Sequence, residues 1–138
     1  MAPPLSGLLE TCLYVEDMER AKRFYREVLG LATLLEEERI TVFRMPDNTV
    51  LILFSRGSTL EPVETPGGMI PPHDGGGPAH FAIGIPVDSV DAWRRHLRDC
   101  EVEIESEIAW PKGRGHSLYF RDPDGHAAEL ATRELWVR

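Results

Sequence analysis

The 138-residue chain lacks the features that mark several classes of protein. It contains two cysteines, Cys12 and Cys100, too few for a disulfide framework, so we expect the protein to work in the reducing cytoplasm. Its 15 Lys and Arg residues stand against 23 Asp and Glu, and the net charge of −8 argues against binding to nucleic acid or to an anionic membrane. No apolar run approaches the roughly 18 residues that a membrane-spanning helix needs. The first six residues contain no Lys or Arg, so we expect no secretory signal.

What the chain does contain is enough apolar residues for one folded domain. Hydrophobic residues make up 42% of the sequence and charged residues 28%, ordinary values for a globular protein. A chain near 150 residues buries roughly 68–70% of the surface that it exposes when unfolded. We therefore predict a single domain over residues 1–138, with a core that needs no disulfide.

Two segments of the chain repeat each other. Residues 41–54 (TVFRMPDNTVLILF) and residues 118–131 (LYFRDPDGHAAELA) are separated by 77 positions. Five of the 14 aligned positions are identical, where ordinary composition gives about one. Each segment has strand-like runs on both sides of a Pro-Asp turn, which predicts two strands joined by a turn in both places.

A weaker repeat precedes each of these hairpins. Residues 10–15 and residues 80–85 both have strand character, and each is followed by an Asp that can cap a helix, Asp17 or Asp88. Apolar residues at helical spacing follow both Asp residues. Further strands are expected in two remaining stretches, near 32–36 and near 101–108.

The chain is therefore predicted to be an α+β protein of two similar modules, each a strand, a helix and three strands. Module one spans about 8–57 and module two about 79–132. Residues 55–79 between them hold 11 of the 23 Gly and Pro residues, which is typical of a linker. So long a linker leaves open whether the modules pair within one chain or between two chains.

Three polar residues occupy strands where apolar residues are expected. Strand alternation places Glu10 and His80 on the face opposite the apolar residues of their strands. Glu129 interrupts the last strand, and its counterpart in the repeat is Ile52, within an apolar strand. A buried carboxylate costs several kcal/mol unless it is paired or bound to a metal. Because Glu10 and His80 hold equivalent places, we predict a shared site of one imidazole and two carboxylates, a set that suits a divalent cation.

Several short stretches, taken in their order and spacing, point to a known family. They are Leu13-Tyr14-Val15 with Asp17, Phe24-Tyr25, Val28-Leu29-Gly30-Leu31, Gly77-Pro78-Ala79-His80-Phe81, Tyr119 to Gly125, and Glu129-Leu130. On these residues the sequence resembles the vicinal oxygen chelate superfamily, which includes glyoxalase I, extradiol dioxygenases, fosfomycin-resistance thiol transferases and bleomycin-resistance proteins. The resemblance covers about residues 8–132. It implies paired βαβββ modules that form a cupped, barrel-like mixed sheet around a metal, with the helices outside, in a homodimer.

The resemblance also implies which residues hold the metal. In this superfamily the ligands come from the first and last strands of each module, which here gives the positions Glu10, Ile52, His80 and Glu129. Ile52 departs from the glyoxalase I pattern, which has a carboxylate at that position, and leaves Glu10, His80 and Glu129 as ligands. Two carboxylates and one His favour hard metals such as Mn²⁺ or Mg²⁺, with Fe, Ni and Zn also open.

The run Ser117-Leu118-Tyr119 is similar to the fosfomycin transferases. Ser117 and Tyr119 share one face of their strand and are expected to meet the substrate as catalytic residues, with Tyr119 able to move a proton. The basic loop 112–115, bordered by Trp110, is expected to clamp an anion. His126, after the turn, is expected at the surface. Three further side chains stay open as site residues: Cys12, His73 and His116.

Three functions fit these features. The first is a metal-dependent enzyme acting on a small oxygen-rich substrate, whose neighbouring oxygens the metal chelates as a Lewis acid; lyase, isomerase, transferase and dioxygenase chemistries share this core. The second is a metal-free protein of the bleomycin-resistance type that sequesters a small cationic ligand. The third is an interaction module whose polar trio is solvated. We favour the enzyme, because three of the four ligand positions carry residues that can bind a metal.

Overall fold

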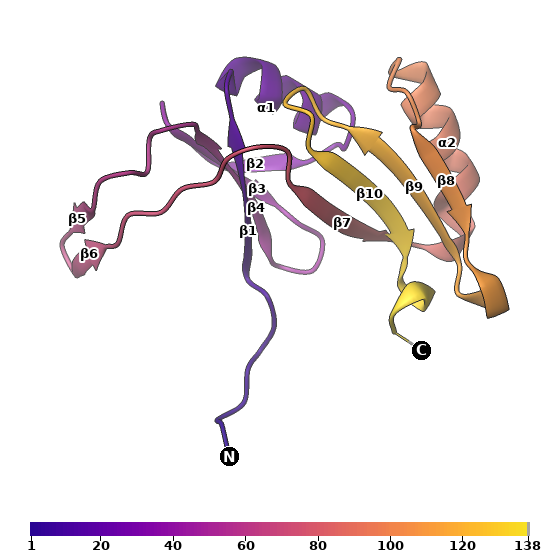
Figure 1. Ribbon diagram of the computed structural model, residues 1–138, viewed down its shortest axis with the longest axis horizontal. Helices are drawn as coiled ribbons and strands as arrows, with labels where there is room; N and C mark the ends of the chain where they lie inside the picture. The colour runs from indigo at the N-terminus through magenta and orange to yellow at the C-terminus, as the bar shows by residue number, and fades with distance from the viewer. Residues whose placement is uncertain (138) are drawn as a thin grey trace. The chain divides into compact units, whose positions relative to one another are not determined.

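Both predicted modules are present in the computed structural model, which describes residues 1–137. The chain consists of two units, Met1–Gly76 (unit 1) and Gly77–Arg138 (unit 2) (Figure 1). In each unit a strand and a helix precede three further strands of the same sheet. Unit 1 contains β1 (Glu10–Val15), α1 (Met18–Glu27), β2 (Ala32–Glu36), β3 (Ile40–Arg44), β4 (Val50–Ser55), β5 (Val63–Thr65) and β6 (Gly68–Ile70). Unit 2 contains β7 (His80–Ile85), α2 (Val90–Asp99), β8 (Ser106–Ala109), β9 (His116–Arg121) and β10 (Ala127–Thr132), with short 3₁₀ turns at Val87–Ser89, Pro111–Gly113 and Arg133–Leu135.

The two four-stranded sheets have the same topology, which confirms the α+β prediction. The strand order is β1-β4-β3-β2 in unit 1 and β7-β10-β9-β8 in unit 2, and the first two strands of each order are parallel. Glu10 pairs with Val50 and His80 pairs with Ala127. Because Val50 and Ala127 are themselves 77 positions apart, the offset found in the sequence is also the structural offset, and Glu10 and His80 occupy equivalent positions.

Strand alternation buries one face of each sheet together with the helix of its unit. In unit 1, the ring of Tyr25 on α1 lies 6.0 Å from that of Phe43 on β3, and both side chains are fully buried. In unit 2, Leu97 on α2 is buried, as are Phe120 and Leu130 on the strands. The opposite face of each sheet is thereby left for other contacts.

The two helices begin differently, although the sequence predicts the same cap for both. Asp17 caps α1, and its Oδ1 accepts a hydrogen bond from the N–H of Arg20 at 3.1 Å. The prediction that Asp88 caps α2 is wrong, because Asp88 lies inside a 3₁₀ turn and Ser89 holds the cap position. This turn forms because both the N–H and the hydroxyl of Ser89 bond the carbonyl of Pro86.

This difference predicts unequal effects of two matched substitutions. Asp17→Ala should lower the free energy of unfolding by about 1 kcal/mol, because the first turn of α1 loses an acceptor for its N–H groups. Asp88→Ala should change it by less than about 0.5 kcal/mol, as at an ordinary surface position. Urea denaturation of both variants measures the two values, and equal losses would contradict the assignment of the caps.

The segment predicted as a linker is partly structured. Within residues 55–79, β5 and β6 form a two-stranded hairpin that projects from the sheet of unit 1 (Figure 1). After it, the N–H of His73 donates to the carbonyl of Thr59 at 2.9 Å, and the His73 ring bonds the hydroxyl of Tyr14. The segment up to Gly76 therefore belongs to unit 1. No helix within residues 1–137 is both long and apolar enough to cross a membrane.

Candidate functional site

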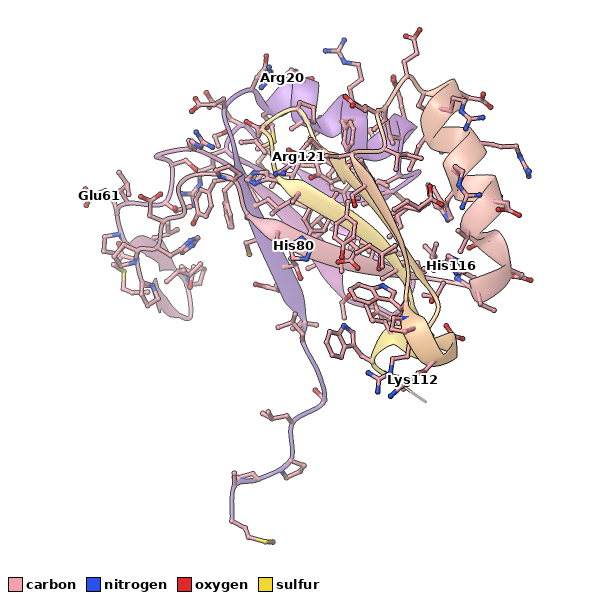
Figure 2. All side chains as sticks on the ribbon, turned by 45° about the vertical axis from the view of Figure 1, so that its right-hand side comes forward. Arg20, Glu61, His80, Lys112, His116 and Arg121 are labelled. Carbon is pink, nitrogen blue, oxygen red and sulfur yellow. The ribbon has the colours of Figure 1, made fainter. Side chains whose placement is uncertain are left out.

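The polar side chains of unit 2 gather on one face of its sheet. His80, which is labelled in Figure 2, begins β7. Glu129 lies in the middle of the neighbouring strand β10. Glu129 pairs in register with Tyr119, and Ala131 pairs with Ser117, so these side chains of β9 share the face of Glu129. The structure thus brings together four of the five site residues predicted from the sequence.

The imidazole of His80 is held in one orientation. Its Nδ1 lies 2.9 Å from the carbonyl oxygen of Ala127. A carbonyl can only accept, so Nδ1 carries a hydrogen and Nε2 is the nitrogen that faces the site. Metal-binding histidines in proteins almost always fix their second ring nitrogen in this way, through a carbonyl, a carboxylate or a water.

Nε2 of His80 faces a carboxylate oxygen. It lies 3.3 Å from Oε1 of Glu129, whose side chain is 6% exposed. When His80 is neutral, both atoms present lone pairs, so the contact needs a proton or a cation. Two ligand atoms each about 2.0–2.2 Å from one metal ion lie about 3.0–3.4 Å apart, so the separation fits a shared ion. These two side chains therefore fit a metal site on their own geometry.

The second oxygen of Glu129 is already bonded. Oε2 accepts a hydrogen bond from the hydroxyl of Ser117 at 2.6 Å. The Ser117 oxygen in turn accepts from the indole Nε1 of Trp110 at 2.8 Å. Sequence reasoning placed Trp110 beside the basic loop but missed this link, because it depends on how the loop between β8 and β9 closes. Oε1 is the oxygen of Glu129 that faces His80.

Tyr119 completes this face. Its ring is stacked near that of His80, with 6.3 Å between the centroids and 28° between the planes. Partial burial raises the pKa of the Tyr119 phenol, and the negative charge of Glu129 raises it further. The hydroxyl therefore stays protonated at neutral pH and can donate to a bound molecule.

The equivalent face of unit 1 is apolar. Ile52, which holds the position of Glu129, is 6% exposed and packs in a buried cluster with Tyr14 and Phe54. Glu10 is exposed at the start of β1. Among the residues that the structure describes, no three His, Cys, Asp or Glu side chains are grouped as a metal site. Within unit 2, the two predicted metal ligands that lie in contact are His80 and Glu129.

The three side chains that the sequence left open have separate places. Cys12 is exposed on β1 and pairs in register with Ile52. His73 bonds Tyr14 within unit 1. His116 lies next to Ser117 on β9, so strand alternation points it to the opposite face of the sheet.

The prediction that His126 lies at the surface is wrong. The side chain is 1% exposed, and its Nδ1 accepts a hydrogen bond from the N–H of Ala79 at 2.8 Å. Its own N–H donates to Oδ1 of Asp122, the carboxylate that organises the turn. The imidazole is buried because it joins this turn to the start of β7, a contact across 47 positions that local sequence does not reveal.

Unit 2 has a hollow of about 290 Å³ at the basic loop, where Trp110 bonds Ser117. Its lining residues are Trp110, Pro111, Lys112, Arg114, Leu135 and Trp136. Two indole rings and two cationic side chains thus border one space. This is the loop in which the sequence predicts an anion clamp.

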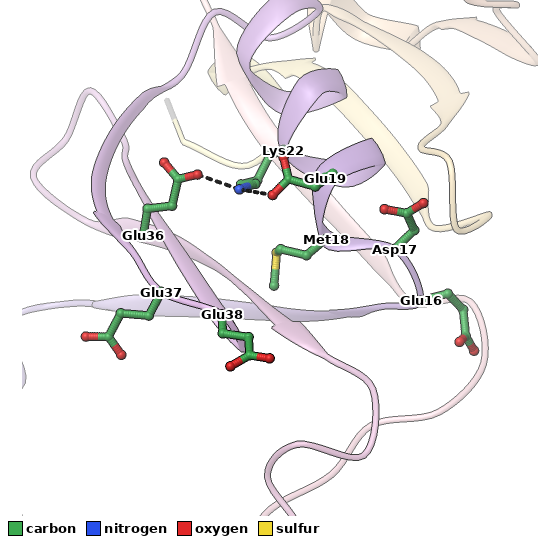
Figure 3. Close-up of a pocket in the computed structure, with 8 residues that line it drawn as sticks. All are labelled: Glu16, Asp17, Met18, Glu19, Lys22, Glu36, Glu37 and Glu38. Atoms are coloured by element: carbon green, nitrogen blue, oxygen red, sulfur yellow. Dashed lines mark hydrogen bonds and ion pairs between the residues drawn. The ribbon is translucent and has the colours of Figure 1, made fainter.

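Unit 1 has a larger and strongly acidic hollow of about 650 Å³ (Figure 3). It is lined by Glu16, Asp17, Met18, Glu19, Lys22, Glu36, Glu37 and Glu38. The buried Lys22 bonds both Glu19 and Glu36. The hydrogen bond to Glu19 is the main cause that raises the pKa of Lys22, and the hydrogen bond from Lys22 is the main cause that lowers the pKa of Glu36. Lys22 is therefore a fixed cation that offsets part of this acidic charge.

Comparison with known proteins decides the family. The model of the Glyoxalase/Bleomycin resistance protein/Dioxygenase superfamily matches residues 7–130. The chain belongs to this superfamily. The fold predicted from the sequence is thereby confirmed.

Members similar to this chain include proteins named for several activities. It is 26% identical over 132 residues to the metallothiol transferase FosB of Bacillus licheniformis, which covers 96% of this chain and 79% of the relative. It is 25% identical over 139 residues to the fosfomycin resistance protein FosX of Listeria monocytogenes, covering 97% and 95%. A crystal structure of that FosX with Mn(II) and sulfate superposes with a TM-score of 0.68 at 22% identity, covering 94% of this chain and 91% of that one. The crystal structure of lactoylglutathione lyase from Agrobacterium tumefaciens is 31% identical, covers 97% and 98%, and gives a TM-score of 0.87.

Proposed function

We propose that this protein is a metal-dependent enzyme that acts on a small oxygen-rich substrate. The observation that carries the proposal is the contact between His80 Nε2 and Glu129 Oε1, two ligand atoms 3.3 Å apart. The second nitrogen of His80 is fixed by the Ala127 carbonyl and the second oxygen of Glu129 by Ser117, so both remaining ligand atoms are aimed at one point. The names of FosB, FosX and lactoylglutathione lyase, and the Mn(II) in FosX, agree with such a role.

We assign Glu10 as the third ligand. It occupies the position in unit 1 that His80 occupies in unit 2, as the pairing of β1 with β4 and of β7 with β10 indicates. One imidazole and two carboxylates favour a hard divalent ion such as Mn²⁺ or Mg²⁺. The set differs from the two His and one carboxylate of iron oxygenases, so we favour transferase, lyase or isomerase chemistry over a dioxygenase.

The residues around the pair have separate tasks in this proposal. A divalent metal held there supplies Lewis-acid stabilisation of negative charge on neighbouring substrate oxygens. Tyr119, kept protonated by its raised pKa, donates a hydrogen bond or a proton to the substrate. Lys112 and Arg114, with the indole of Trp110, bind an anionic part of the substrate in the hollow that they line.

Metal analysis tests this function directly. Tag-free protein purified without added metal or chelator should contain, or take up on titration with Mn²⁺, Fe²⁺, Ni²⁺ and Zn²⁺, about one divalent ion per chain. Elemental analysis by mass spectrometry and isothermal titration calorimetry measure the two quantities. Failure to bind any of these ions would contradict the proposal.

The same titration decides how the site is completed. We expect a homodimer, in which Glu10 comes either from the chain that supplies His80 or from a second copy. Neither Glu10→Ala nor His80→Ala should bind Mn²⁺ tightly when alone. If the site forms between chains, unfolding and refolding the two variants together restores binding to part of the sites. If the site forms within one chain, the refolded mixture still does not bind Mn²⁺ tightly.

The second candidate function is sequestration of a cationic ligand without a metal. It is favoured by the apolar face of unit 1, where Ile52 replaces a ligand, and by the net charge of −8. Calorimetry with a cationic aromatic compound in the presence of a chelator tests it. Tight binding under these conditions by a protein that takes up no metal would favour sequestration over catalysis.

A further inference from the structure

A chain of two hydrogen bonds leads from the Trp110 indole to the Glu129 carboxylate. Trp110 Nε1 lies 2.8 Å from Ser117 Oγ, and Ser117 Oγ lies 2.6 Å from Glu129 Oε2. We propose that Trp110 and Ser117 are positioning residues that hold Glu129 in the orientation that binds metal. This inference rests on the proposed function and assigns to Ser117 a role through Glu129 in place of the substrate contact expected from the sequence.

The donor and acceptor properties of the three groups fix the direction of both bonds. An indole nitrogen is a donor only, so the Ser117 oxygen must accept from Trp110. An ionised carboxylate is an acceptor only, so the single hydroxyl hydrogen of Ser117 must point to Glu129. Trp110 therefore sets the rotation of the Ser117 hydroxyl, and the hydroxyl marks Oε2 as the oxygen turned away from His80.

Because Ser117 and Glu129 are buried, losing the hydrogen bond between them is costly. Ser117 is fully buried, and Glu129 is 5% exposed. Water has little access to replace a lost donor at Oε2, and a buried charged acceptor without its donor is destabilised. Without Ser117 the carboxylate would satisfy both oxygens by rotating toward other donors, and Oε1 would leave the line to His80 Nε2.

The starting point of the chain is itself anchored. The N–H of Trp110 donates to the carbonyl of Gly115 at 2.8 Å, which closes the loop that carries the indole. The N–H of His116 donates to Oγ1 of Thr132 at 3.1 Å, which ties the end of this loop to β10. The second anchor joins the two strands that carry Ser117 and Glu129, so the closed loop holds the indole relative to them.

Titration with Mn²⁺ tests the consequence for the metal. Ser117→Ala should weaken Mn²⁺ binding by about 10- to 100-fold, the usual effect of removing a group that orients a ligand. Trp110→Phe should weaken it less, by about tenfold at most, because the Ser117 hydroxyl remains but is free to rotate. Trp93→Phe on α2 and Ser106→Ala, on the strand next to Ser117, are the matched controls and should bind as the wild type does.

Nuclear magnetic resonance of the metal-free protein tests the chain itself. Its three Trp residues give three indole N–H signals. In Ser117→Ala the signal of Trp110 should shift strongly, because its acceptor is lost, while that of Trp93 on α2 should stay in place. In Ser106→Ala all three should stay in place.

The two measurements separate the possible failures. An unmoved Trp110 signal in Ser117→Ala would show that the hydrogen-bonded chain is absent. A moved signal together with unchanged Mn²⁺ affinity in Ser117→Ala and Trp110→Phe would overturn the positioning role while leaving the proposed function intact. A wild-type protein that binds no divalent ion would overturn the proposed function, and the positioning role with it.

Discussion

Replacing Glu129 with alanine should abolish stoichiometric binding of Mn²⁺ and leave the fold intact. Glu129 supplies one of the two ligand atoms that converge in unit 2, and the loss of a direct ligand should weaken binding by more than about 100-fold, beyond the effect of losing a group that only orients one. The fold should survive because the variant removes a buried charge rather than creating one. Calorimetric titration measures the affinity, and thermal denaturation without metal measures the stability.

Two further variants make this result specific. Glu129→Gln keeps the shape of the side chain but loses the charge, so it should also bind Mn²⁺ poorly. Glu105→Ala removes an exposed carboxylate of the same unit that pairs with Arg121, and it should bind Mn²⁺ as the wild type does. One tightly bound Mn²⁺ per chain in Glu129→Ala would remove this residue from the metal site.

The sequence predicts the members of this site better than the bonds between them. Glu129 and His80 stand out because each interrupts the polarity expected of its strand. The repeat adds that His80 corresponds to Glu10 and Glu129 to Ile52. The partner that fixes the His80 ring, the carbonyl of Ala127, follows only from the register of β7 against β10, 47 residues along the chain. The link from Trp110 to Ser117 depends likewise on the closure of a loop.

The fold shows the same division between repeated and unique features. The two sheets are predicted because strand alternation and the 77-residue offset each leave a signal in the sequence. The hairpin of β5 and β6 leaves none, because each strand has only three residues, too few for a visible alternation, in a stretch rich in Gly and Pro. The burial of His126 is also unpredictable from local sequence, because its hydrogen-bond partner Ala79 lies 47 positions away along the chain.

Gly115→Ala is expected to destabilise the protein more than any other exchange of glycine for alanine in unit 2. Gly115 has a φ of +85°, and a Cβ built there would lie 1.7 Å from Oγ1 of Thr132. Thr132 is 1% exposed and cannot move aside freely. Left-handed backbone strain of about 1–2 kcal/mol and overpacking of about 1–3 kcal/mol together predict a loss of about 2–5 kcal/mol in the free energy of unfolding.

Gly113→Ala separates the two contributions to this loss. Gly113 lies in the same loop with a φ of +67°, but a Cβ there would meet nothing within 4 Å. This variant should therefore lose only about 1–2 kcal/mol from backbone strain. Equal stabilities of the two variants in urea denaturation would show that Thr132 makes way for the added carbon. Adding Thr132→Ala to Gly115→Ala should recover part of the loss, since the clashing oxygen is gone, but not all of it, because the N–H of His116 then lacks its acceptor.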